Sequence, residues 1–184
     1  MSIREQYTPG PAGGAQVRKN DGDKWTLILT RELRHSPEKV WKALTDPAHL
    51  REWAPFDVDH SLANVGTVKL TWVGTPTAMD TKVTRAEAPN VLEYDDTRWE
   101  LEPYGGGTRL TLWHNIDRRF ISMGAAGWHI AFDTLDRLLS GRPIGRMAGL
   151  EATKFDGWQR LNAEYAAQFG VKAPNWPPKA VQNS

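Results

Sequence analysis

Apolar positions near the start of the chain repeat with the two-residue period of a β-strand. In residues 24–33, an apolar set formed by Trp25, Leu27, Leu29 and Leu33 falls on alternate positions, with Ile28 as an apolar exception on the other face. Alternation places such a set on one face of a strand, where a core can cover it. The segment is therefore predicted to be a half-buried strand.

Two helix-start signals follow this strand. Ser36 and Pro37 form the first, because serine caps a helix and proline fits its first turn. Asp46 and Pro47 repeat the signal. Pro47 also ends the first helix, since the residue before a proline is disfavoured in helical conformation. The pattern predicts two short helices that meet at an angle, the second of them reaching Trp53.

Residues 57–116 carry strand patterns separated by turn-forming residues. After a short alternating segment at Val58 and His60, strands are predicted at 67–73, 82–86, 91–96, 98–102 and 108–116. Three glycines at 105–107 permit positive φ in a hairpin. No helix follows them and no Lys-Ser/Thr pair closes them, so they are not a phosphate-binding loop.

The period then changes to that of a helix. Residues 123–139 place one apolar set on a single face: Trp128, Ala131, Phe132, Leu135 and Leu139. Gly141 and Pro143 are expected to end this helix. A further helix is predicted at 157–169, with Gly170 as its terminator. Strands followed by helices in separate runs indicate an α+β fold.

The two ends differ in composition from the middle of the chain. Residues 1–22 are rich in proline, glycine and polar groups, which predicts a flexible tail. Residues 171–184 are predicted to be a proline-rich tail. One domain is therefore expected at 23–170.

Composition excludes several classes of function. The net charge is +1, which does not favour binding to nucleic acid. Cysteine is absent, which excludes disulfides, thiolate catalysis and cysteine-bound zinc. No apolar run reaches the roughly 20 residues that a bilayer span needs. We expect no membrane insertion, no secretion signal and a cytoplasmic location. The nine tryptophans suit either a filled core or a cavity lined by aromatic rings.

Three motifs resemble a known family. They are SPEKVWKALTDPAHLREW at 36–53, TRLTLWH at 108–114 and GWHIAFDTLDRLLSG at 127–141. Together they resemble the heat-shock-protein-90 ATPase activator homologues, within the wider SRPBCC superfamily of START, birch-pollen-allergen-like and polyketide-cyclase-like proteins. The resemblance covers residues 24–141.

This resemblance implies a helix-grip fold, in which a curved antiparallel sheet wraps around a long C-terminal helix over a hydrophobic cavity. The two short helices after the first strand would plug one side and bring Trp53 and Phe56 to the cavity mouth. The chain departs from the family by a single tryptophan at 53, where many relatives have paired aromatics. It also departs by the extra helix at 157–169, which affects the pocket mouth or a dimer surface.

A curved sheet around one helix leaves an apolar pocket wherever side chains do not fill it. Each bulky residue on the inward face, taken singly, is better explained as plain core. As a set they suggest incomplete packing. The candidate ligand-binding residues are Trp53, Phe56, Leu70, Trp72, Tyr94, Trp99, Leu112, His114, Trp128 and Phe132.

Titratable residues offer few chemical sites. His114 could bind a ligand or transfer protons, but a histidine satisfied by a backbone carbonyl or by Tyr94 is favoured. His60 is a weaker candidate, and a metal site built from the two histidines lacks a third ligand. His129 and Asp133 could form a base and its orienting carboxylate, although a solvated flank is favoured. No serine lies in a Gly-x-Ser-x-Gly elbow, and no cofactor is implied.

Three functions remain open at this point. We favour a non-enzymatic binder of a small apolar or amphipathic molecule. The alternatives are a cyclase or aromatase that uses Tyr94, His114 and possibly His60, and a co-chaperone that stimulates a heat-shock ATPase. A homodimer through Trp158, Tyr165 and Trp176 is possible, but packing onto the parent domain explains these residues equally well.

Overall fold

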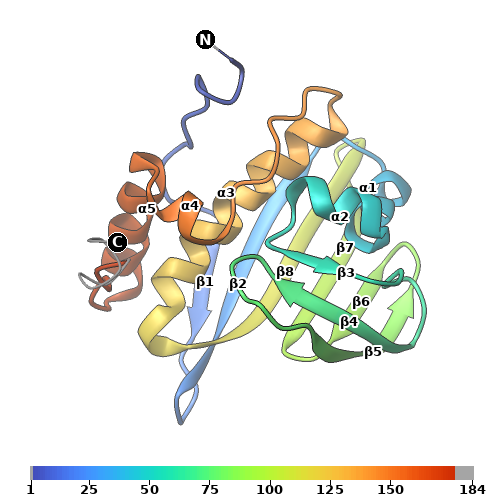
Figure 1. Cartoon of the computed structure of the whole chain (residues 1–184), viewed down its shortest axis with the longest axis horizontal. Helices are drawn as coiled ribbons and strands as arrows, with labels where there is room; N and C mark the ends of the chain where they lie inside the picture. Colours follow the sequence, from blue (N-terminus) through green and yellow to red (C-terminus); the bar gives the residue numbers. More distant parts are fainter. Residues whose placement is uncertain (1, 177–184) are drawn as a thin grey trace.

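The computed structural model describes residues 2–176, and eight antiparallel strands within that range form one curved sheet (Figure 1). In chain order the strands are β1 (Ala15–Arg18), β2 (Lys24–Leu33), β3 (Phe56–Val58), β4 (Gly66–Trp72), β5 (Met79–Glu87), β6 (Val91–Tyr94), β7 (Thr97–Tyr104) and β8 (Gly107–Asp117). The spatial order is β1-β2-β8-β7-β6-β5-β4-β3. The first long strand therefore pairs with the last one.

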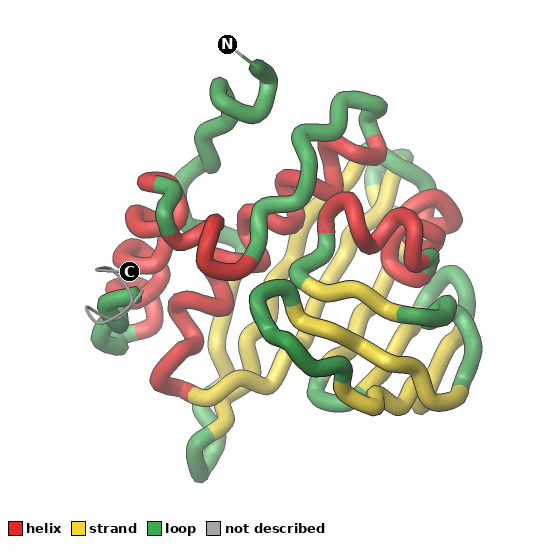
Figure 2. The backbone as a smooth tube through the Cα atoms, viewed as in Figure 1, coloured by secondary structure: helices red, strands yellow, loops and turns green. Residues whose placement is uncertain are grey.

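Helices connect and cover this sheet. They are α1 (Pro37–Thr45), α2 (Pro47–Trp53), a 3₁₀ turn η1 (Arg118–Phe120), α3 (Ile121–Leu139), α4 (Gly149–Thr153) and α5 (Asp156–Phe169). Figure 2 shows the sheet curving around α3, with α1 and α2 at one end of this helix. The predicted face of α3 is buried, including Trp128, Phe132 and Leu135. This arrangement is the expected α+β helix-grip fold.

The helix boundaries follow the predicted capping signals. The Ser36 side chain accepts a hydrogen bond from the Lys39 backbone N–H, and the Asp46 side chain accepts one from that of Ala48. Gly141 and Gly170 follow α3 and α5 with φ of 76° and 70°, a conformation that glycine adopts without strain.

The break at Pro47 leaves a backbone carbonyl of α1 without its helical donor, and Trp53 supplies a donor instead. In a continuous helix the carbonyl of Ala43 would accept the N–H of residue 47, but proline has none. The indole Nε1–H of Trp53 donates to this carbonyl at 2.9 Å. The Thr45 carbonyl accepts the backbone N–H of Leu62 at 3.0 Å. The buried end of α1 is thus satisfied from outside the helix.

The prediction of a flexible tail at residues 1–22 was wrong for two parts of that segment. Residues 15–18, predicted to belong to a flexible tail, form the edge strand β1, which pairs with β2 from Ala15↔Leu29 to Arg18↔Thr26. Tyr7, also in the predicted tail, is buried. Residues 171–176 of the predicted C-terminal tail follow α5, and the rest of that tail lies outside the described residues. Each helix within residues 2–176 is too short or too polar to cross a lipid bilayer.

The role of Trp53 can be tested by Trp53→Phe. The substitution keeps a ring in the core but leaves the Ala43 carbonyl buried without a donor. We expect the free energy of unfolding to fall by about 1–3 kcal/mol, measured by urea denaturation. Trp113 is the matched control because it is partly exposed on the other face of the sheet. Trp113→Phe is expected to change stability by less than about 0.5 kcal/mol. Equal losses in both variants would contradict this role.

Candidate functional site

A cleft of about 510 Å³ opens at the N-terminal half of α3. One wall is formed by the end of β4, the turn after it and the end of β8. The opposite wall comes from the chain that follows α3. The lining residues are Pro55, Trp72, Val73, Gly74, Thr75, His114, Asn115, Ile116, Phe120, Met123, Gly124, Gly127, Trp128, Met147, Ala148, Gly149, Leu150, Ala152, Thr153, Trp158 and Trp176.

Within residues 2–176, the lining is apolar and uncharged. It contains four tryptophans and two methionines, and it includes no Lys, Arg, Asp or Glu. Among the described lining residues, His114 is the one with an ionisable side chain. A cleft of this size and composition matches the general character of small-molecule sites, which are mostly apolar with a few polar groups.

His114 is fixed at the base of the cleft by two tryptophans. The indole Nε1–H of Trp128, on α3, donates to Nδ1 of His114 at 3.0 Å. The Trp72 ring, on β4, lies parallel to the imidazole at a centroid distance of 6.1 Å. The Trp128 ring is nearly perpendicular to the imidazole, at 82°. The hydrogen-bond partner is therefore Trp128, and the expectation of a backbone carbonyl or Tyr94 was wrong.

Burial lowers the pKa of His114 from 6.5 to about 4. Two charged side chains act on the ring with opposite signs: Asp96 raises this pKa and Lys24 lowers it. These two groups pair with each other at 2.6 Å. Desolvation therefore dominates, and His114 is a neutral imidazole at pH 7.

The structure divides the ten predicted site residues into two groups. Trp72, His114 and Trp128 line the cleft. The other seven pack in the core: Trp53, Phe56, Leu70, Tyr94, Trp99, Leu112 and Phe132. Trp53 and Phe56 are each only 1% exposed, so the prediction that they lie at a cavity mouth was wrong. The physical reason is that Trp53 caps α1 and contacts Trp99 edge-on at 6.2 Å.

The three side chains considered for acid/base catalysis are not brought together. Tyr94 is buried, and its hydroxyl oxygen accepts a hydrogen bond from Trp99 Nε1 at 3.0 Å. Burial raises the pKa of Tyr94, so its hydroxyl stays protonated. The side chain of His60 is 74% exposed and pairs with Asp59. Of the three, only His114 reaches the cleft.

Sequence reasoning missed much of the outer wall of the cleft. After α3, the chain turns back along this helix before it enters α4 (Figure 1). This segment and the elements after it contribute Met147, Leu150, Trp158 and Trp176 to the lining. Trp158 and Tyr165 are buried within the chain, and Trp176 contacts Phe120 edge-on. The sequence did contain one signal for this wall. The apolar face of the extra helix predicted at 157–169 had to pack against some surface of the domain.

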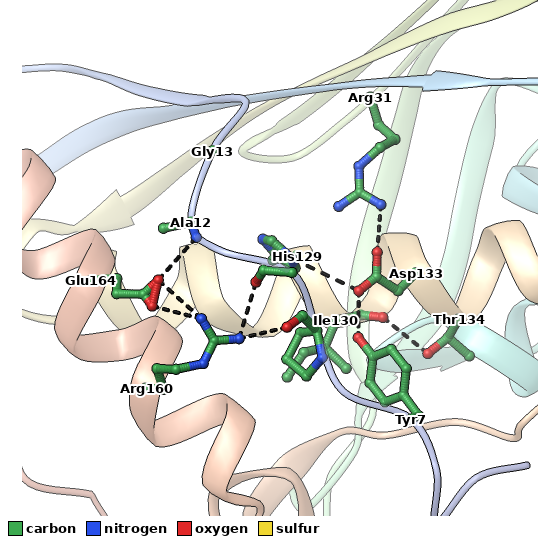
Figure 3. Close-up of polar contacts among 12 residues, drawn as sticks. Tyr7, Ala12, Gly13, Arg31, His129, Ile130, Asp133, Thr134, Arg160 and Glu164 are labelled. Atoms are coloured by element: carbon green, nitrogen blue, oxygen red, sulfur yellow. Dashed lines mark hydrogen bonds and ion pairs between the residues drawn. The ribbon is translucent and has the colours of Figure 1, made fainter.

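A second polar cluster joins α3 to the N-terminal segment (Figure 3). Asp133 accepts hydrogen bonds from Arg31 at 2.5 Å and from the Tyr7 hydroxyl. His129 Nδ1 lies 2.7 Å from the Tyr165 hydroxyl, and its Nε2 lies 3.8 Å from Asp133. The expectation of a solvated flank was wrong for His129, which is 5% exposed.

The cluster at Asp133 fastens the N-terminal segment to the domain. The Tyr165 hydroxyl donates to the Gly13 carbonyl at 3.1 Å and accepts its N–H at 3.2 Å. Arg160 donates to the Pro9 carbonyl at 2.6 Å, and Glu164 accepts the Ala12 N–H at 3.2 Å (Figure 3). Each of these groups already has a partner within the chain. We therefore assign the cluster a structural role, which is to hold the N-terminal segment on α3 and α5. Within residues 2–176, no three His, Asp or Glu side chains converge to form a metal site.

The fold is that of a helix-grip protein, with an apolar cleft beside α3. The family described as Activator of Hsp90 ATPase homolog 1-like protein matches residues 34–140, more than half of the chain. The chain belongs to this family, as its three motifs indicated. The matched range ends before Met147, so the outer wall of the cleft lies beyond it. No curated protein matches the sequence.

Solved structures share the fold at low sequence identity. CalU16 from Micromonospora echinospora, in its solution structure, is 18% identical with a TM-score of 0.62, over 89% of this chain and 95% of that chain. A conserved protein of unknown function from Enterococcus faecalis, EF2215, is 15% identical with a TM-score of 0.64, over 86% and 92%. Protein MLL2253 from Mesorhizobium loti is 25% identical with a TM-score of 0.55, over 63% and 97%. These likenesses support the architecture.

The neutral state of His114 predicts a pH dependence of stability. Its pKa is lower in the folded chain than the unfolded value of 6.5, so the unfolded chain takes up a proton first as the pH falls. The stabilising contribution is complete above pH 6.5 and is lost as the pH falls to about 4.

We therefore expect wild type to lose on the order of 2 kcal/mol more stability than His114→Phe between pH 7 and pH 4. Urea denaturation at several pH values measures this difference, and NMR titration measures the pKa directly. A difference that stays constant over this range, together with a His114 pKa near 6.5, would rule out the neutral buried imidazole.

Proposed function

We propose that this chain binds a small apolar or amphipathic molecule in the cleft between the sheet and α3. The observation that carries the proposal is the lining of a cleft of about 510 Å³. Within residues 2–176, its walls include Trp72, Trp128, Trp158 and Trp176 and no charged side chain. Functional ligand pockets commonly measure about 300–1,000 Å³ and are mostly apolar. Membership of a helix-grip family supports a ligand-binding or cyclase-like role in general terms.

Binding without chemistry is favoured over the cyclase alternative. Acid/base catalysis on a bound substrate usually needs positioned groups that both take and give protons. Among the described residues, His114 is the titratable side chain that lines the cleft. The Tyr94 hydroxyl is buried and engaged by Trp99. The co-chaperone alternative rests on the name of the family, and stimulation of a heat-shock-protein-90 ATPase by the purified chain would test it.

Two further expectations belong to this proposal. We also propose a cytoplasmic location. A chain without cysteine needs no disulfides, so it is compatible with a reducing compartment. A homodimer would need a surface other than the faces of Trp158 and Tyr165, because both side chains are buried inside the chain. We expect one ligand for each chain.

Gly127 allows the cleft to be filled without disturbing the fold. It lies on α3 and lines the cleft, and a Cβ built on it meets no atom within 4 Å. Gly127→Leu should place a large side chain in the cleft. It should also favour the helix, because glycine inside a helix costs about 0.5–1 kcal/mol relative to alanine.

We expect wild type to bind the uncharged fluorescent probe N-phenyl-1-naphthylamine with one-to-one stoichiometry. Gly127→Leu should weaken this binding at least tenfold while thermal stability stays equal or rises. Ala167→Leu, on the exposed side of α5, is the matched control and should bind as wild type does. Native mass spectrometry gives the stoichiometry. Unchanged probe binding in Gly127→Leu would show that the cleft is not the site.

A further inference from the structure

Most polar side chains that line the cleft are already engaged within the chain. Thr75 donates its hydroxyl proton to the Trp72 carbonyl at 2.8 Å. Thr153 donates to the Leu150 carbonyl at 2.7 Å. Asn115 accepts the hydroxyl proton of Thr26 at 2.8 Å. Among the ionisable side chains of this lining within residues 2–176, the imidazole of His114 is the one available to a ligand.

The bond from Trp128 fixes which nitrogen of His114 carries the proton. An indole N–H can only donate, so Nδ1 of His114 must accept and cannot hold a proton itself. The proton of the neutral ring is then on Nε2. Nε2 has no hydrogen-bond partner within residues 2–176, and the partly exposed ring belongs to the lining of the cleft. The imidazole therefore presents an unpaired N–H donor to the cleft.

The cleft offers no partner for a charged ligand. The charged groups that act on His114 are Asp96, from the turn between β6 and β7, and Lys24 of β2, and these pair with each other. A carboxylate or ammonium group would lose its water shell without gaining a countercharge, which is costly. A neutral hydrogen-bond acceptor gives up little hydration free energy when it enters the cleft, and it gains one hydrogen bond from His114.

The aromatic walls add a preference for shape. Trp72 and His114 lie nearly parallel, at 5°, and Nε2–H points along the plane of the imidazole. A flat group conjugated to the acceptor can extend in the same orientation, alongside the Trp72 ring. Flat rings gain from stacking on such a wall.

We propose that the cleft selects uncharged, flat aromatic molecules that carry a carbonyl-type acceptor, and that His114 recognises this acceptor through Nε2–H. This inference rests on the proposed function, because it specifies the ligand class of the same cleft. It assigns His114 a binding role as a hydrogen-bond donor.

Three probes of nearly equal shape separate the possibilities. 2-Acetylnaphthalene carries a ketone, 2-isopropenylnaphthalene replaces the ketone oxygen by a CH₂ group, and 2-naphthoate carries a carboxylate. We expect the ketone to bind about three- to tenfold more tightly than the alkene, in line with one net hydrogen bond. The naphthoate should bind most weakly at pH 7. Quenching of tryptophan fluorescence and calorimetry measure the affinities.

His114→Phe tests the role of the donor. The variant keeps a ring beside Trp72 but has no N–H, so the ketone and the alkene should bind equally well. His60→Phe is the matched control, because His60 is exposed outside the cleft, and should keep the ketone preference. A ¹⁵N spectrum of the wild-type histidines provides a readout that does not depend on a variant. It should show the Nε2–H tautomer for His114 and a shift of that nitrogen with the ketone alone.

The outcomes distinguish this inference from the proposed function. Equal affinity of wild type for ketone and alkene, or tightest binding of the naphthoate, overturns the inference while the cleft remains a binding site. An Nδ1–H tautomer of His114 overturns it as well. If none of the three probes binds, and N-phenyl-1-naphthylamine does not bind either, both the proposed function and the inference fail.

Discussion

The hydrogen bond from Trp128 to His114 is the contact on which the character of this site depends. It joins α3 to β8 at 3.0 Å, and it pairs two polar groups that would otherwise be costly to bury between helix and sheet. The same bond decides the chemistry of the imidazole. Because Nδ1 must accept, the ring presents a donor to the cleft, and burial keeps it neutral with a pKa of about 4. The packing of α3 on the sheet thus decides that the imidazole offers the cleft a hydrogen-bond donor and not an acceptor.

A second constraint explains why the open space lies at this end of α3. The break at Pro47 leaves the Ala43 carbonyl without its helical donor, and Trp53 turns inward to supply one. With Trp53 buried, its ring packs on Trp99, which in turn contacts Trp128 and Phe132. These rings fill the space between sheet and helix beneath α1 and α2. The remaining volume lies toward the N-terminal half of α3, where Gly124 and Gly127 present no side chain. The chain beyond residue 140 then covers it.

Much of the fold could be predicted from the sequence, because it depends on local signals. Capping residues and prolines placed α1 and α2, and alternation placed β2 and β8 and their buried faces. Position along a strand was harder to predict, since a period of two gives the face of a residue but not its depth. Leu112 and His114 share one face of β8, yet only His114 reaches the cleft. β1 and α4 were missed because each is short and depends on tertiary contacts. The partners of His129 and Asp133 come from segments distant in the sequence, so spacing alone could not reveal them.

A neutral imidazole that donates from Nε2 is compatible with two different functions. The same hydrogen bond that holds a ligand carbonyl would also stabilise the negative charge that develops on that oxygen in an enolate. The distinction between binder and cyclase therefore depends on whether a base can reach the ligand. His114 cannot serve as that base through Nε2, which already carries the proton. The rest of the lining, as far as residues 2–176 form it, has no carboxylate, lysine or tyrosine. Family and fold leave both functions open, as is common for shared architectures. The composition of this cleft is what favours binding.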